Sequence, residues 1–262
     1  MDVIVFSGQS NMQGQTEGLP TVNSVVDGAW EYRYLTDSLE PLSHPVGEDI
    51  LLNGQELLLG AHNGGGSLVP YFCDEYVKRT QKEVAAIHVA KGATKIEEWL
   101  PSTERFRAML QKISSGIKKI SEQSLIENVY FIWLQGESDA VAATTSQTYK
   151  ESFLAIKSAL KSAFGIQKFG IIKVGYFASQ VSWMKRGTHA ERLSMDEAIM
   201  LAQEELVEKD DDIVMLTRIC TEYSLCKDKL NPNAEGHYNN AAMEELGRAA
   251  ARELALFSIN SD

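Results

Sequence analysis

A serine directly follows the first short apolar run of the chain, in the hexapeptide S-G-Q-S-N-M at residues 7–12. Val3–Phe6 is typical of a buried strand, and parallel α/β sheets bind their ligands at the carboxyl ends of strands. A serine in the turn after such a strand can expose its hydroxyl beside backbone N–H groups that receive an oxyanion. Turns and helix N-caps show the same local pattern. Ser10 is therefore a candidate nucleophile, although Met12 stands where the G-x-S-x-G elbow has its second glycine.

A serine hydroxyl needs a base that takes its proton, and the natural base is a histidine. Of the five histidines, His88 lies within an apolar stretch that predicts a buried core residue. His44, His62 and His189 lie in loop-like stretches, where we expect surface groups. His237 precedes the last helical stretch, in a loop that can carry it back over the end of the first strand. We take His237 as the candidate base.

A catalytic histidine is usually oriented by a carboxylate, which fixes its tautomer and stabilises the imidazolium. Glu235 is close to His237 in sequence, whereas Glu137 follows a predicted strand at Val129–Leu134. Both residues are equally compatible with solvated loop carboxylates. Donors for an oxyanion are offered by Gly92, which follows another predicted strand, and by the side-chain amide of Gln135.

Short apolar runs alternate with amphipathic stretches along most of the chain, which predicts βαβ units, a parallel sheet and a single domain over residues 1–262. The predicted strands are Val3–Phe6, Val84–Ala90, Val129–Leu134, Phe169–Phe177 and Asp212–Leu216. The predicted helices are Leu68–Arg79, Glu104–Ile120, Gln147–Ala163, Ser194–Glu208 and Ala241–Leu256.

The segment Gln13–Gly66 is too long for an ordinary βα loop, and long loops are often functional. Its aromatic and basic stretch Trp30–Tyr34 would suit stacking on a sugar, or equally a small aromatic core under the loop. The three glycines at 64–66 resemble an anion cradle, but they lack the P-loop lysine and follow no convincing strand. A flexible turn explains the glycines better than a nucleotide site.

The formal net charge of −11 argues against nucleic acid or anionic lipid as a partner, because both need clustered Lys and Arg. Three cysteines without a C-x-x-C pair favour free thiols. No apolar stretch reaches membrane-spanning length and the first residues do not form a signal peptide, so we expect a cytoplasmic protein. The chain has no H-E-x-x-H and no Cys/His cluster, so we expect neither a metal nor another cofactor.

Four blocks together resemble carbohydrate esterase family six and the related sialate O-acetylesterases (SASA domain) of the SGNH hydrolases. These blocks are G-Q-S-N-M at 8–12, K-G-A-T-K-I-E-E-W at 91–99, W-L-Q-G-E-S-D at 133–139 and G-H-Y-N at 236–239. The resemblance implies a three-layer α/β/α sandwich with a central, mainly parallel, five-stranded, flavodoxin-like sheet. It also implies metal-independent hydrolysis of acetylated carbohydrates, with Ser10 as nucleophile and His237 as base. The oxyanion hole would consist of the Ser10 backbone, Gly92 and the Gln135 side chain.

One position departs from that pattern. Many SGNH enzymes have an Asp three residues before the histidine, and this chain has Ala234 there. The imidazole must then be oriented by another group or by a backbone carbonyl alone, and Glu137 resembles the acid of some members more than Glu235 does. The rival hypothesis is a carbohydrate-binding protein that kept the fold and lost the chemistry. The sugar itself, xylo-oligosaccharide or sialate, and the oligomeric state do not follow from the sequence.

Overall fold

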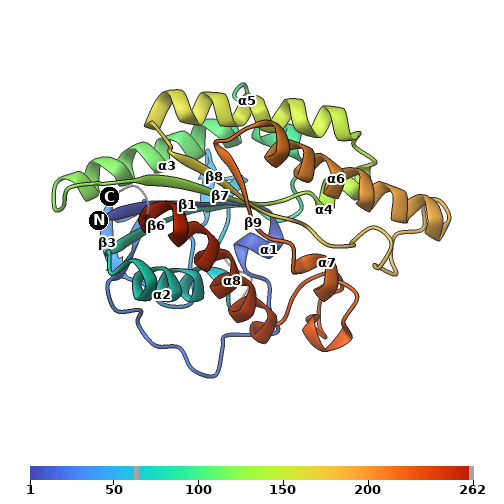
Figure 1. The fold of residues 1–262 in the computed structure, drawn as a ribbon, viewed down its shortest axis with the longest axis horizontal. Coiled ribbons are helices and arrows are strands. Elements are labelled where there is room, and N and C mark those ends of the chain that lie inside the picture. The colour runs from blue at the N-terminus through green and yellow to red at the C-terminus, as the bar shows by residue number, and fades with distance from the viewer. Residues whose placement is uncertain (62–64, 260–262) are drawn as a thin grey trace.

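The computed structural model describes residues 1–61 and 65–259 and shows three layers, with helices on both faces of a central sheet (Figure 1). The strands of the central sheet lie in the order β3-β2-β6-β1-β7-β8-β9. Five of them run parallel in the order β6-β1-β7-β8-β9, which is the flavodoxin-like 2-1-3-4-5 arrangement. The predicted three-layer, mainly parallel fold is confirmed.

The five parallel strands agree with the apolar runs of the sequence, and most are buried on both faces, as parallel strands between two helix layers must be. They are β1 (Asp2–Gly8), β6 (Val84–Ala90), β7 (Val129–Leu134), β8 (Lys168–Ile172) and β9 (Ile213–Thr217). The predicted strand Phe169–Phe177 was too long. Beyond Lys173 the chain leaves β9, and the amides of Val174 and Tyr176 donate to Gln203 and Ser224 side chains instead.

Helices α3, α5 and α6 cover one face of the sheet, and α2 and α8 pack side by side on the other (Figure 1). The long helices are α2 (Leu68–Thr80), α3 (Glu104–Ser121), α5 (Ser146–Phe164), α6 (His189–Lys209) and α8 (Asn240–Ile259). Short helices are α1 (Ser10–Gln13), α4 (Glu137–Ala142) and α7 (Cys220–Tyr223), with 3₁₀ turns at Ile96–Trp99 and Lys227–Lys229. The far end of α8 is tied to β1, because Ser258 Oγ donates to Asp2 Oδ2 at 3.2 Å.

The prediction of five strands was wrong in number, because the long segment after β1 adds two strands to the sheet. These are β2 (Ala29–Arg33), which pairs parallel to β6, and β3 (Ser38–Pro41), which pairs antiparallel to β2. The same segment forms a separate hairpin from β4 (Ile50–Leu52) and β5 (Glu56–Leu59).

A buried ion pair holds this segment against the helices. Lys112 of α3 bonds to Glu48 at 2.7 Å, and the two side chains are 1% and 7% exposed. Glu48 also accepts hydrogen bonds from the amides of Tyr34 and Leu35, at the end of β2. Since removing one partner of a buried ion pair leaves an unpaired buried charge, this contact fixes the long segment firmly in place.

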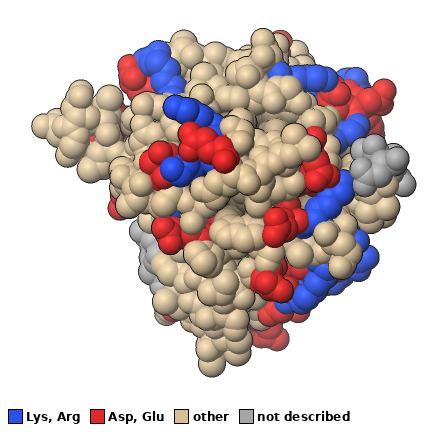
Figure 2. All heavy atoms as spheres, turned by 90° about the vertical axis from the view of Figure 1, so that its left-hand side faces the viewer, with Lys and Arg blue, Asp and Glu red and all other residues tan. Residues whose placement is uncertain are grey.

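Charges on the face at the left of Figure 1 are intermingled, with Lys and Arg next to Asp and Glu in small clusters (Figure 2). Lys82, just before β6, forms an ion pair with Glu127, just before β7, at 3.2 Å. No described helix is both long and apolar enough to cross a membrane.

Candidate active site

Ser10 is the first residue of α1 and follows β1 at the carboxyl edge of the sheet, next to the point where the strand order reverses. Gly8 has φ +146°, and a Cβ there would overlap the carbonyl of Leu134, so the turn requires glycine. Ser10 is 5% exposed and lines a cavity of about 780 Å³. Within residues 1–61 and 65–259 neither its hydroxyl nor its amide N–H has a hydrogen-bond partner.

His237 lies in the loop before α8 and lines the same cavity. Its Nδ1 is 3.0 Å from the main-chain oxygen of Glu235. A carbonyl only accepts, so Nδ1 carries the proton and Nε2 is left as an acceptor. Burial lowers the pKa of His237, and the carbonyls of Glu235 and Ala234 oppose that effect only in part. The imidazole is thus held neutral and in the tautomer that a general base needs.

Glu137, at the start of α4, is fully buried and interacts with the nucleophile segment. Its Oε1 accepts a 2.7 Å hydrogen bond from Asn11 Nδ2, which also reaches the carbonyl of Gly236 at 3.4 Å. The other oxygen, Oε2, has no partner among the described residues. Burial raises the pKa of Glu137, against the lowering effect of the Asn11 contact. Asn11 therefore joins Glu137 to the loop that carries His237.

Neither predicted acid contacts the imidazole with its carboxylate. In the described part of the chain Glu137 bonds to Asn11, not to His237. Glu235 directs both carboxylate oxygens to Ser182, whose amide and hydroxyl each donate at 2.7 Å. Its contact with the histidine comes from its backbone carbonyl, one of the two alternatives that the sequence analysis left open.

The Gln135 side chain is not among the residues that line the cavity, although its Nε2 donates to Gln9, which does, at 3.3 Å; its expected role as an oxyanion donor stays a prediction. It is fully buried, and Nε2 donates to Asp139 Oδ2 at 2.6 Å and to the carbonyl of Thr94 at 2.9 Å. Gln9 completes this network, because its Oε1 accepts from the amides of Gly136 and Ser138 at 3.3 and 3.1 Å. Asp139, which the sequence analysis did not single out, competes for the amide hydrogens of Gln135.

Gly92 lies beside the nucleophile, since a Cβ placed on it would be 3.4 Å from Cβ of Ser10. Its amide N–H donates at 2.6 Å to Oε1 of Gln13, a side chain that also lines the cavity. The N–H of Gly92 can therefore donate to an oxyanion only after Gln13 has moved.

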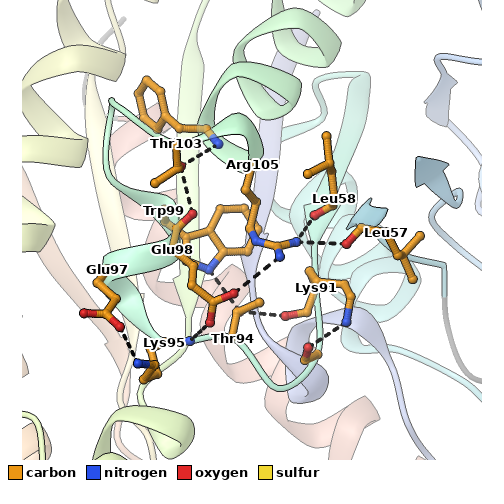
Figure 3. Close-up of polar contacts among 12 residues, drawn as sticks. Leu57, Leu58, Lys91, Thr94, Lys95, Glu97, Glu98, Trp99, Thr103 and Arg105 are labelled. Atoms are coloured by element: carbon orange, nitrogen blue, oxygen red, sulfur yellow. Dashed lines mark hydrogen bonds and ion pairs between the residues drawn. The ribbon is translucent and has the colours of Figure 1, made fainter. Parts of the chain in front are cut away.

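The loop that carries Gly92 is braced by the polar cluster in Figure 3. Thr94 Oγ1 donates to the carbonyl of Lys91 at 2.7 Å and accepts from Nε1 of Trp99 at 3.0 Å. The Arg105 guanidinium lies 5.7 Å from the centre of the Trp99 ring and donates to the carbonyls of Leu57 and Leu58. Arg105 thus joins β5, whose Leu57 lines the cavity, to the Gly92 loop.

An aromatic wall lies on the histidine side of the cavity. The Phe177 ring contacts the imidazole of His237 edge-on, with centroids 6.1 Å apart, and the Trp183 ring at 6.2 Å. Phe177 is held by the buried Asp196, which accepts from the amides of residues 177, 178 and 179 and from the Ser179 hydroxyl. The sequence analysis missed these residues, because they come from a loop and from the interior of a helix, where no local motif marks them.

The other candidate residues lie elsewhere. Tyr32 of the aromatic stretch is fully buried in β2, away from the cavity, which favours the small-core interpretation over sugar stacking. Gly66 donates to Thr16 and Gly18 and packs against Asn240, so it is part of a packed turn. Gly64 and His62 lie outside the described residues.

The remaining histidines divide into two groups. His88 is buried as expected and bonds to the carbonyl of Met12 at 3.1 Å. His189 is exposed at the start of α6. The expectation that His44 is a surface group was wrong, because the amide of Ser67 donates to it in the interior and it is 5% exposed. In the described ranges no group of three His, Cys, Asp or Glu residues is arranged to hold a metal ion.

Solved structures place the fold among those of ester hydrolases. A protein of Arabidopsis thaliana superimposes with a TM-score of 0.71 at 16% identity, covering 98% of both chains. A carbohydrate acetylesterase from Xanthomonas citri gives 0.54 at 16% identity, covering 98% of this chain and 56% of that one. A lipase/acylhydrolase from Enterococcus faecalis gives 0.50 at 12% identity, covering 98% and 97%. A comparison with curated protein sequences finds no match.

The fold and the family together define a carboxylic ester hydrolase that acts on acetyl esters. The family described as "Carbohydrate esterase, sialic acid-specific acetylesterase" matches residues 1–255, and the chain belongs to it. The predicted resemblance is confirmed.

Proposed function

We propose that the chain hydrolyses O-acetyl esters of carbohydrates through an acetyl-serine intermediate, with Ser10 as nucleophile and His237 as base. One observation carries the proposal. Ser10 and His237 come from opposite ends of the chain and line one cavity, and the imidazole has Nδ1 engaged and Nε2 available as an acceptor. That is the protonation state in which a histidine activates a serine hydroxyl.

In the first step Ser10 Oγ attacks the acetyl carbonyl while Nε2 of His237 takes the hydroxyl proton. The tetrahedral oxyanion would be bound by the free amide N–H of Ser10 and, once Gln13 has moved, by that of Gly92. Collapse of the intermediate breaks the ester bond, and the departing sugar oxygen receives the proton from His237. Water then attacks acetyl-Ser10 by the same route and releases acetate.

The histidine works in this scheme without a side-chain acid. The carbonyl of Glu235 fixes its tautomer, while Glu137 acts through Asn11 on the backbone at Gly236. Glu137 is then a positioning residue and not the third member of a triad. Gln135 binds the Asp139 carboxylate and the Thr94 carbonyl through Nε2, and this scheme gives it no oxyanion contact.

The substrate is an acetylated xylo-oligosaccharide or a similar sugar, and O-acetylated sialic acid is the alternative that the family description favours. The acetylesterase activity named for the Xanthomonas citri structure supports a carbohydrate acetate. We further propose that the chain is a single esterase domain, which the family match over residues 1–255 supports.

The first experiment compares wild type and Ser10→Ala on 4-nitrophenyl acetate, without added metal and with a chelator present. We expect wild-type turnover to survive chelation and the variant to lose about 10⁶-fold, since removing a serine nucleophile leaves little catalysis. Wild-type enzyme that is inactive on this ester and on an acetylated xylo-oligosaccharide, yet binds the sugar, would replace the esterase with the carbohydrate-binding alternative.

A further inference from the structure

Trp183 is a large aromatic side chain exposed within the candidate active site. It is 56% exposed and lines the cavity together with Ser10 and His237. Exposed aromatic surface inside a pocket is typical of a ligand contact, because a bound ligand removes this apolar surface from water. A sugar ring has an apolar C–H face of matching size, so the Trp183 ring suits a pyranose.

The chemistry requires the sugar to lie on this side. His237 must give its proton to the departing sugar oxygen, so the sugar lies next to the imidazole in the reactive complex. Trp183 reaches the imidazole through one intervening ring, Phe177, which contacts both at centroid distances close to 6 Å. The acetyl group would then occupy the opposite side, next to Ser10 and Gly92.

Glu235 connects the same two elements by a second route. Its carboxylate accepts both hydrogen bonds from Ser182, the residue before Trp183. Its main-chain oxygen accepts the Nδ1 proton of His237. The bonds from Ser182 lower the pKa of Glu235, so the carboxylate stays ionised and keeps both contacts.

We propose that Trp183 is the stacking platform for the leaving-group sugar and that Glu235 is a positioning residue that keeps this platform in register with His237. This inference rests on the proposed esterase function and adds a sugar subsite to it. Glu235, first considered as an alternative acid, would thus serve substrate selection through its side chain.

The test compares kcat and KM on an acetylated xylo-oligosaccharide with those on 4-nitrophenyl acetate, which has no sugar. For Trp183→Ala we expect the loss in kcat/KM on the sugar to exceed the loss on the aryl ester by about tenfold, which corresponds to ~1.4 kcal/mol of stacking. Trp183→Phe should recover most of that loss, because it restores an aromatic face. Glu235→Gln should move the same ratio in the same direction, mainly through KM.

The double variant Trp183→Ala/Glu235→Gln distinguishes positioning from an independent effect. If Glu235 acts through Trp183, the double variant is no worse on the sugar than Trp183→Ala alone. The matched control is Glu191→Gln, since the Glu191 carboxylate accepts from the amide and hydroxyl of Thr188 in the same way, but neither residue adjoins Trp183 or His237 in the chain. Equal losses on both substrates in every variant, or additive losses in the double variant, would overturn the proposal.

A binding measurement separates this proposal from the esterase function itself. In the Ser10→Ala background, calorimetric binding of the acetylated xylo-oligosaccharide should weaken about tenfold on adding Trp183→Ala. An inactive wild type with Trp183-dependent binding would reject the esterase and keep the subsite. An active wild type with binding unaffected by Trp183→Ala would keep the esterase and reject the subsite.

Discussion

At the scale of single residues, the histidine is the group with the most unusual environment. A carbonyl in place of a carboxylate leaves the imidazolium without a full negative charge beside it. Part of the stabilisation that an aspartate gives in a serine protease is then missing. Burial acts in the same direction and favours the neutral form.

The pH dependence of hydrolysis follows from this environment. A lowered pKa means that His237 loses its proton at lower pH than an ordinary histidine, and only the neutral form is a base. We therefore expect kcat/KM to fall along a single acid limb whose midpoint lies below pH ~6.5, and to level off at higher pH. A midpoint above the ordinary histidine value, measured on an aryl acetate, would mean that a carboxylate faces the ring in the working enzyme.

Glu137→Gln tests the role of the buried carboxyl group. The amide oxygen of glutamine still accepts from Asn11, so we expect kcat/KM to stay within about tenfold of wild type. Glu137→Ala removes the acceptor and should lose more. A triad carboxylate would instead cost about 10⁴-fold on conversion to the amide. A loss of that size in Glu137→Gln would restore Glu137 as the acid.

At the scale of elements, the loop between Leu230 and Asn240 determines where the base lies. Gly236 has φ +76°, and a Cβ there would overlap the ring of Phe177. Its carbonyl accepts from Asn11, so the loop is confined on both sides. A change at this glycine must move either the aromatic wall or the histidine.

For Gly236→Ala we expect kcat/KM on an aryl acetate to fall by about 100-fold, because a displacement of roughly 1 Å is enough for such a loss. The control is Gly165→Ala, which has φ +61° at the end of α5 but no atom near its missing Cβ. Both variants should lose stability by about 1 kcal/mol from the strained backbone. A fall in kcat/KM that is equal in the two variants would show that the Phe177 contact does not determine where the histidine lies.

Strands and helices were predictable because burial on both faces produces continuous apolar runs, and capped amphipathic helices separate them. The extra strands β2 and β3 were not, since they are short and lie at the edge of the sheet. The strand ending at Ile172 was extended too far because Val174–Phe177 is also apolar. Its hydrogen bonds go to side chains, which periodicity does not record.

The candidate site was likewise predictable in part. Ser10 and His237 stand at ends of elements, where strand topology alone predicts proximity. The directions of Gln135 and Glu137 depend on partners distant in sequence, Asp139 excepted, and no local pattern could supply them. Trp183 was overlooked because its loop has no motif and its importance depends on Phe177 and Glu235.

At the scale of the whole molecule, the first residues of the chain and its last segment are joined twice. Asp2 bonds to Ser258 at one end, across 256 residues, and Asn11 bonds to Gly236 at the other, across 225. The strands and helices from β2 to β9 lie, in sequence, between the two partners of each contact. The parallel sheet is therefore dominated by contacts between distant parts of the chain.

These two contacts can form only after the last segment of the chain has been synthesised. A chain emerging from the ribosome has the proposed nucleophile almost from the start, but the proposed base arrives only near the end, and long-range contacts form slowly. On the proposed mechanism, Ser10 has no base until the loop before α8 is in place, and the chain hydrolyses no ester before then. Hydrolytic activity would thus report a late stage of folding, since no amino-terminal fragment that ends before His237 contains both proposed reacting groups.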